Sequence, residues 1–168
     1  MGDDYWYQVW GPPQRPGNRP DLSVILPSLL VGEYPTPDDA EWLRRAHGVS
    51  AVVSLQDDAD IASKGLTVRA LERAYRVHDL AFHRIPVPDC DNDVLAAQVN
   101  RTVGLLHALA SAGARVYLHC NAGMNRAPTM AIAYLHTHGG LSLPEARDFV
   151  KARRHCVPYM RVLEAHFA

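Results

Sequence analysis

The chain alternates between two patterns of hydrophobic residues, one typical of strands and one typical of helices. Short apolar runs bounded by polar residues predict buried strands at residues 23–26, 28–32, 51–55, 81–87 and 116–118. Apolar residues spaced three and four apart predict helices at residues 37–47, 66–78, 95–109, 128–138 and 143–154, with a short helix after Pro158. The polar stretch 56–60 is expected to be a loop.

Residues that favour helix ends support these boundaries. Thr36 and Pro37 are typical of a helix start, Gly48 of a helix stop, and Ser142 with Glu145 has the spacing of a capping box. The alternation of strands and helices predicts an α/β fold, a three-layer sandwich whose central, mostly parallel sheet is flanked by helices. Ligands bind such sheets beyond the carboxyl ends of central strands, so the loop after residues 116–118 is the expected site.

Residues 1–20 differ in composition from the rest of the chain. They contain Tyr5, Trp6, Tyr7 and Trp10, followed by several prolines. This density of proline and glycine argues against a helix, so we expect an extended arm at 1–20 and one folded domain at 21–168. The arm either docks a partner or substrate, or its aromatic rings tack the terminus onto the domain, and the second interpretation is favoured.

Composition excludes several classes of function. A net charge of −1 over 168 residues gives no electrostatic case for binding nucleic acid or an acidic membrane surface. The three cysteines form no CxxC and the nine histidines are interpreted as surface residues, so neither a metal site nor another cofactor is expected. No secretion signal or membrane-spanning apolar stretch is visible, which leads us to expect a cytoplasmic protein; the oligomeric state is left open.

The stretch RVYLHCNAGMNRAP, residues 115–128, carries the strongest chemical signal. A predicted strand leads into Cys120, and Arg126 stands at the start of the next helix. The residues between can curl so that their N–H groups surround one anion, with the positive end of the helix aimed at the same point. Gly123 is expected to keep a Cβ out of that space. We therefore predict that Cys120 is a nucleophile in a phosphate-binding loop of Asn121, Ala122, Gly123, Met124, Asn125 and Arg126.

The nucleophile needs strong stabilisation of its anion. A free cysteine has a pKa of about 8.5, and lowering it by about 3 units takes roughly 4 kcal/mol. A helix dipole supplies at most about 2 kcal/mol, so the loop amides and the planar fork of Arg126 must supply the rest. A lone buried cysteine is more often a small core residue, but the strand–loop–helix setting favours the nucleophile.

Expulsion of an alkoxide or phenoxide from a phosphomonoester also needs an acid that protonates the leaving oxygen. Asp89, Asp91 and Asp93 follow the predicted strand 81–87 and are the candidates. The residues alone leave this choice open, because aspartate and asparagine also favour turns for backbone reasons.

The loop HCNAGMNRAP resembles the His-Cys-x5-Arg signature of cysteine-dependent protein phosphatases, specifically of the dual-specificity group. The resemblance runs from about Leu22 to Tyr159. Within the group the chain is most similar to the plant glucan phosphatases, through LLVGEYPTPDDAEWL, VVSLQDDADI, the Ala127-Pro128 pair and KARRHCVPY. This resemblance implies the cysteine-based phosphatase fold for residues 21–168 and places the acid at Asp89.

Two residues depart from what the resemblance implies. Most of the family has Ser or Thr directly after the loop arginine, where a hydroxyl helps the thiolate leave, and here Ala127 takes that place. The glucan phosphatases share this alanine and are active. Asn125 replaces the glycine that usually precedes the arginine in the glucan group.

Three functions are compatible with these residues. The favoured one is a dual-specificity or tyrosine protein phosphatase acting on a phosphorylated protein. The alternative is a phosphoglucan phosphatase, which needs aromatic faces for sugar rings; the family's aromatic places hold residues 61–64, Cys90 and 136–138 here, although Trp6 and Trp10 could substitute. An inactive phosphate-binding module is disfavoured, because Cys120, Arg126 and the loop aspartate are all present.

Overall fold

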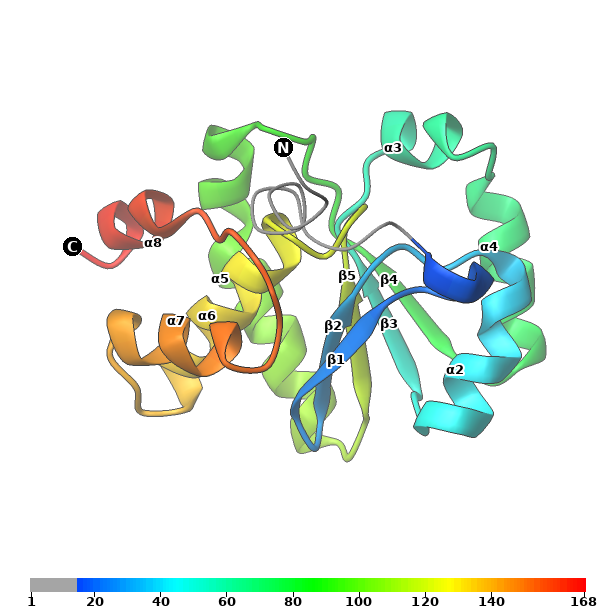
Figure 1. The fold of residues 1–168 in the computed structure, drawn as a ribbon, viewed down its shortest axis with the longest axis horizontal. Helices are drawn as coiled ribbons and strands as arrows, with labels where there is room; N and C mark the ends of the chain where they lie inside the picture. The colour runs from blue at the N-terminus through cyan, green and yellow to red at the C-terminus, as the bar shows by residue number, and fades with distance from the viewer. Residues whose placement is uncertain (1–14) are drawn as a thin grey trace, which may run out of the picture.

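The computed structural model describes residues 15–168, and in this part of the chain the strands form one sheet in the order β1-β2-β5-β3-β4 (Figure 1). The strands are β1 (Leu22–Leu26), β2 (Leu29–Gly32), β3 (Ala51–Ser54), β4 (Ala81–Arg84) and β5 (Val116–His119). Strands β1 and β2 are antiparallel, and every other neighbouring pair is parallel. The predicted mostly parallel sheet is confirmed.

Helices cover both faces of the sheet (Figure 1). One face packs against α2 (Ala40–His47), α3 (Asp58–Ser63) and α4 (Val68–Val77). The other face packs against α5 (Asn92–Ser111), α6 (Arg126–His138), α7 (Leu143–Lys151) and α8 (Met160–His166). These two layers and the sheet between them confirm the predicted three-layer sandwich.

The two hydrophobic cores arise from the alternation of side chains along the inner strands. Leu30, Val52 and Tyr117 point into the core beneath α2 and α4, and their neighbours in β2, β3 and β5 point into the core beneath α5 and α6. All four residues of β5 are buried, because a strand lies on either side of it and helices lie above and below. The site loop therefore leaves from the fully buried central strand of the sheet.

Two local predictions are wrong. The stretch 56–60 is not wholly a loop, because α3 begins at Asp58. Asp57 caps this helix by accepting from the Asp60 N–H at 2.8 Å, and the Asp60 carboxylate accepts in return from the Asp57 N–H at 3.2 Å. The helix is too short to show a helical period, so its capping residues were the only sequence signal. The strand predicted at 81–87 is shorter than expected, because β4 ends at Arg84. Beyond it, the Ile85 and Val87 N–H groups still donate to the Ser54 and Leu55 carbonyls at the end of β3.

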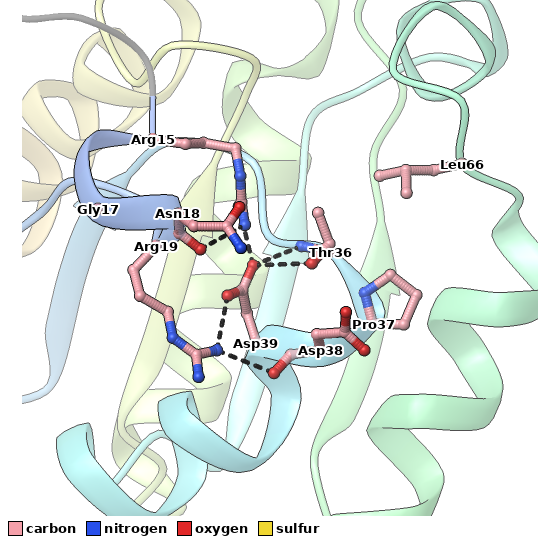
Figure 2. Close-up of a pocket in the computed structure, with 9 residues that line it drawn as sticks. All are labelled: Arg15, Gly17, Asn18, Arg19, Thr36, Pro37, Asp38, Asp39 and Leu66. Carbon is pink, nitrogen blue, oxygen red and sulfur yellow. Dashed lines mark hydrogen bonds and ion pairs between the residues drawn. The ribbon is translucent and has the colours of Figure 1, made fainter.

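The first described residues are tied to the domain by a buried carboxylate. Residues 1–14 of the expected arm lie outside the described part of the chain, and a single 3₁₀ turn, Pro16–Asn18, follows them. On either side of that turn, Arg15 and Arg19 donate to the two carboxylate oxygens of Asp39 at 2.8 and 2.9 Å (Figure 2).

The bonds to Asp39 leave its pKa below the ordinary value, although burial alone would raise it. The pocket of about 660 Å³ that Figure 2 shows lies over this cluster. Because its arginines already bind the buried carboxylate, the cluster is explained as an anchor for the segment that precedes β1.

Candidate active site

The loop between β5 and α6 forms the floor of a cavity of about 240 Å³. Cys120 and Arg126 are each 2% exposed, and both line the cavity. The other residues that line it are Lys64, Asp89, Asn121, Ala122, Met124 and Asn125. The structure thus brings together every predicted site residue except Gly123, at the carboxyl end of a central strand as expected.

The carbonyl groups of this loop are held by partners outside the cavity. The Tyr34 N–H donates to the Asn121 carbonyl at 2.9 Å, and the Val157 N–H donates to the Met124 carbonyl at 2.8 Å. Arg154 donates to the two carbonyls between them. Its Nη2 donates to the Ala122 carbonyl at 3.1 Å, and its Nε donates to the Gly123 carbonyl at 2.7 Å. In a planar trans peptide the N–H points opposite to the carbonyl, so the N–H groups of residues 122–125 point away from these donors. This is the arrangement that binds an anion.

Gly123 serves a purpose other than the one expected. Its φ is +63°, and a Cβ there would lie 2.5 Å from the carbonyl carbon and oxygen of Gly32 and 2.6 Å from Arg154 Nη2. A side chain at this position would therefore push the loop off β2 and Arg154, rather than intrude on the cavity.

Asp60 holds Arg126 in place. Arg126 Nη1 donates to Asp60 at 2.6 Å and to the Val87 carbonyl at 2.7 Å, so one end of the guanidinium is used by the protein and the rest of the fork remains for a ligand. The other carboxylate oxygen of Asp60 accepts from Asn121 Nδ2 at 2.7 Å, and Gln56 Nε2 donates to Asn121 at 2.8 Å.

Asp60 and Arg126 each stabilise the charged form of the other. Burial raises the pKa of Asp60, but the bonds from Arg126 and Asn121 outweigh it and leave that pKa below its ordinary value. Burial likewise lowers the pKa of Arg126, and the charges of Cys120, Asp60 and Asp89 reverse this. Asp60 is not among the predicted site residues; its only sequence signal was the QDDADI stretch.

The candidate acids occupy different environments. The Asp89 carboxylate lies 3.5 Å from Arg126 Nε, lines the cavity, and its side chain is 53% exposed. Asp91 is the N-cap of α5, where its carboxylate accepts from the Val94 N–H at 3.0 Å. Asp93 lies in the first turn of the same helix and does not line the cavity. The geometry therefore separates Asp89 from the other two.

Known proteins share this fold, and a family model matches most of the chain. Residues 36–164 match the model of the dual specificity phosphatase catalytic domain. The chain belongs to this family.

Phosphoglucan phosphatase DSP4 of Castanea sativa is 30% identical over 148 residues, which cover 86% of this chain and 39% of that protein. Human dual specificity protein phosphatase 2 is 31% identical over 130 residues, 77% of this chain and 37% of that protein. The chain thus spans about two fifths of the length of such relatives. The crystal structure of Tk-PTP in its active form superposes with a TM-score of 0.73 at 22% identity, covering 86% of this chain and 95% of that one.

One histidine of this phosphatase domain was wrongly expected at the surface. His119 is 1% exposed and stacks on Tyr117 with ring centroids 5.7 Å apart. Its Nδ1 lies 2.9 Å from the Cys120 carbonyl, so Nδ1 carries the proton, because a carbonyl can only accept. Burial lowers the pKa of His119 to about 4, so the ring is neutral at physiological pH.

Within residues 15–168, no group of three or more His, Cys, Asp or Glu side chains could hold a metal ion.

Lys64 is a further cavity residue of the phosphatase domain that was not predicted. Its ammonium lies 5.0 Å from the centroid of the Tyr34 ring, and the Arg15 guanidinium lies 5.3 Å from the same centroid. Lys64 follows α3, whose existence local periodicity did not reveal. It adds a second positive charge beside the anion site.

No helix of the described chain is long and apolar enough to cross a bilayer.

We predict that Arg154→Leu lowers kcat/KM on an aryl phosphate roughly 10- to 100-fold, because two loop carbonyls lose the donor that orients their peptides. The affinity for inorganic phosphate as a competitive inhibitor should fall in parallel. Near-ultraviolet circular dichroism would report the folded fraction, by which each rate is divided.

The matched control is Arg153→Leu. Arg153 precedes Arg154 in the chain, but its Nη1 donates at the surface to the Phe149 carbonyl at 3.0 Å. This variant should keep the wild-type kcat/KM. Equal losses in the two variants would contradict a specific role of Arg154 in shaping the loop.

Proposed function

We propose that this chain hydrolyses phosphate monoesters through a cysteinyl-phosphate intermediate, with a phosphorylated protein as the favoured substrate. The observation that carries the proposal is the set of outward-bonded carbonyls around Cys120, which turns the loop N–H groups toward the place of a phosphate dianion. Phosphate oxygens would accept from these amides and from Arg126, which leaves the phosphorus facing the Cys120 sulfur.

The reaction then has two steps. The Cys120 thiolate attacks phosphorus, the bond from phosphorus to the leaving oxygen breaks, and that oxygen takes a proton from the Asp89 carboxyl. In the second step water attacks the phosphorus, Asp89 takes a proton from the water, and the phosphorus–sulfur bond breaks to return the thiolate and release phosphate. Asp60 keeps Arg126 oriented through both steps.

A phosphorylated protein is favoured over a phosphoglucan by the residues around the cavity. Of the described residues that line it, none is aromatic, whereas a sugar chain is best held on aromatic faces. Lys64 instead offers a charge to an acidic neighbour of the phosphorylated residue. Phosphoglucan is the second candidate, because similarity to a phosphoglucan phosphatase is as strong as similarity to dual-specificity protein phosphatases. A cytoplasmic location stays a prediction.

The first test is Cys120→Ser. It should abolish hydrolysis of a generic aryl phosphate while the protein stays folded. A serine hydroxyl stays protonated and cannot supply the anionic nucleophile that the loop stabilises in the cysteine. Side-by-side assays of the wild type on phosphotyrosine peptide, phosphothreonine peptide and solubilised phosphoglucan should rank the phosphotyrosine peptide first. Residual turnover in Cys120→Ser, or loss of wild-type turnover with a metal chelator, would overturn the mechanism.

The second prediction concerns the acid. Asp89→Asn should cut kcat/KM, which reports the first step, about 100-fold on an alkyl phosphate, and far less on an ester of a good phenolate leaving group, which needs little protonation. Asp91→Asn is the matched control and should change neither rate by more than about twofold, because an asparagine side chain can still cap α5. Opposite behaviour of the two variants would move the acid to Asp91.

The third prediction concerns Ala127, which is fully buried directly after Arg126. The nearest hydroxyl in sequence is already engaged, since Thr129 Oγ1 donates to the Asn125 carbonyl at 2.7 Å and accepts from the Tyr159 N–H at 2.9 Å. Hydrolysis of the phospho-cysteine should therefore limit turnover. Rapid mixing with an aryl phosphate should release a burst of about one phenol per site before the steady state.

Ala127→Ser should raise steady-state turnover severalfold and shrink this burst, without changing the first step. Ala131→Ser, another buried position one turn further along α6, controls for the cost of burying a hydroxyl and should leave the burst intact. A linear time course in the wild type, with an unchanged rate in Ala127→Ser, would show that a loop amide or a water already assists the leaving thiolate.

A further inference from the structure

Gln56 is a fully buried polar residue that does not line the active-site cavity. It lies just beyond β3, and its backbone is held by the sheet. The Leu55 N–H directly before it donates to the His119 carbonyl at the end of β5 at 2.9 Å, and Arg84 Nη2 donates to the Gln56 carbonyl at 3.3 Å. Gln56 is therefore fixed beside the point where the phosphate loop leaves β5.

A chain of side-chain hydrogen bonds joins Gln56 to Arg126, and it can run in only one direction. The Asp60 carboxylate only accepts, so its two oxygens face two donors, Arg126 Nη1 at 2.6 Å and Asn121 Nδ2 at 2.7 Å. The Asn121 amide consequently turns its Oδ1 away from Asp60, and Gln56 Nε2 donates to that oxygen at 2.8 Å. The orientation of each amide thus follows from the guanidinium at the other end of the chain.

Asn121 is the link between this chain and the phosphate loop. It is the first loop residue after Cys120, and its carbonyl is already held by the Tyr34 N–H at 2.9 Å. Without a donor at its Oδ1, the side-chain amide could turn over, and Oδ1 would then face the Asp60 carboxylate instead of Nδ2. The Gln56 donor therefore keeps the Asn121 bond to Asp60 in place.

The rest of the Gln56 amide does not stabilise the fold. Within residues 15–168, Gln56 Oε1 is buried and has no hydrogen-bond partner. Burying such an oxygen costs free energy that an apolar side chain of similar size would not cost. The bond from Nε2 to Asn121 is the feature that explains an amide at this place.

We propose that Gln56 is a positioning residue that fixes the Asn121 amide and, through Asp60, aims the Arg126 guanidinium at the substrate phosphate. The proposal rests on the proposed function, in which Arg126 binds the phosphoryl group. The competing explanation is that Gln56 only fills space at the end of β3.

Gln56→Met tests the proposal, because it keeps the length of the side chain and removes the donor. We expect kcat/KM to fall about tenfold, and equally on an alkyl phosphate and on an ester of a good phenolate, since both present the same phosphoryl group to Arg126. Gln56→Leu removes the same donor with a differently shaped side chain and should give the same loss. Near-ultraviolet circular dichroism gives the folded fraction by which each rate is divided.

Thr102→Val is the matched control. Thr102 is equally buried, but it lies in α5 and its hydroxyl donates to the Gln98 carbonyl at 2.8 Å. This variant should keep the wild-type kcat/KM. In nuclear magnetic resonance spectra, the guanidinium N–H signals of Arg126 should shift in Gln56→Met and stay in place in Thr102→Val, which a space-filling role of Gln56 would not produce.

The decisive comparison is made in the Asn121→Ala background, which removes the link. If Gln56 acts through Asn121, adding Gln56→Met to Asn121→Ala should cause no further loss of kcat/KM. A full additional loss in that background, or wild-type kinetics in both Gln56→Met and Gln56→Leu, would overturn the proposal.

A binding measurement separates this inference from the proposed function. Tungstate, a tetrahedral dianion shaped like phosphate, is titrated calorimetrically into Cys120→Ser with and without Gln56→Met, and the second substitution should raise its Kd about tenfold. Weaker tungstate binding together with full turnover in Cys120→Ser would overturn the proposed mechanism and leave the role of Gln56 at the anion site standing. An unchanged Kd, with turnover abolished in Cys120→Ser, would overturn only the role of Gln56.

Discussion

The outward hydrogen bonding of the carbonyls of residues 121–124 is the constraint on which the rest of this site depends. Residues 121–124 carry no charged side chain, and their peptides orient correctly only when other parts of the protein bind their carbonyls. Arg154 supplies two of these bonds, and single N–H groups of Tyr34 and Val157 supply the others. The donors come from the chain just after β2, from the turn that follows α7 and from the segment before α8, so three segments far apart in the sequence contribute to one small anion site.

The second requirement is that the buried guanidinium of Arg126 has partners in the protein and still keeps hydrogen-bond donors for the phosphate. Asp60 and the Val87 carbonyl bind one nitrogen of Arg126, which compensates its burial, and the remaining nitrogens face Asp89 and the cavity. Removing either partner of such a buried pair leaves an uncompensated charge, which is far more costly than the pair itself is stabilising. The same carboxylate accepts from Asn121, so the orientation of Arg126 and the shape of the loop are set together.

The acid side of the site is built differently. Asp89 sits on an exposed turn with Cys90 in the left-handed region, and its contacts within residues 15–168 are few compared with those of Asp60. Such a residue can move between a leaving oxygen and a water, as the two steps require, provided that a neighbour limits its range. The rigid nucleophile loop and the looser acid turn therefore suit the different tasks assigned to them.

Local sequence patterns determined the strand–loop–helix around Cys120, the position of Arg126, the helix starts at Thr36 and Ser142 and the three-layer arrangement, because these depend on residues close together in the chain. They could not choose between Asp89 and Asp91, since that choice rests on which carboxylate caps α5. Nor could they reveal that Arg154 orients the loop from 31 residues away, that Asp60 binds Arg126 across 66 residues, or that His119 is buried. These contacts form only when the sheet brings distant segments to one edge, and no spacing along the chain records which groups will meet there.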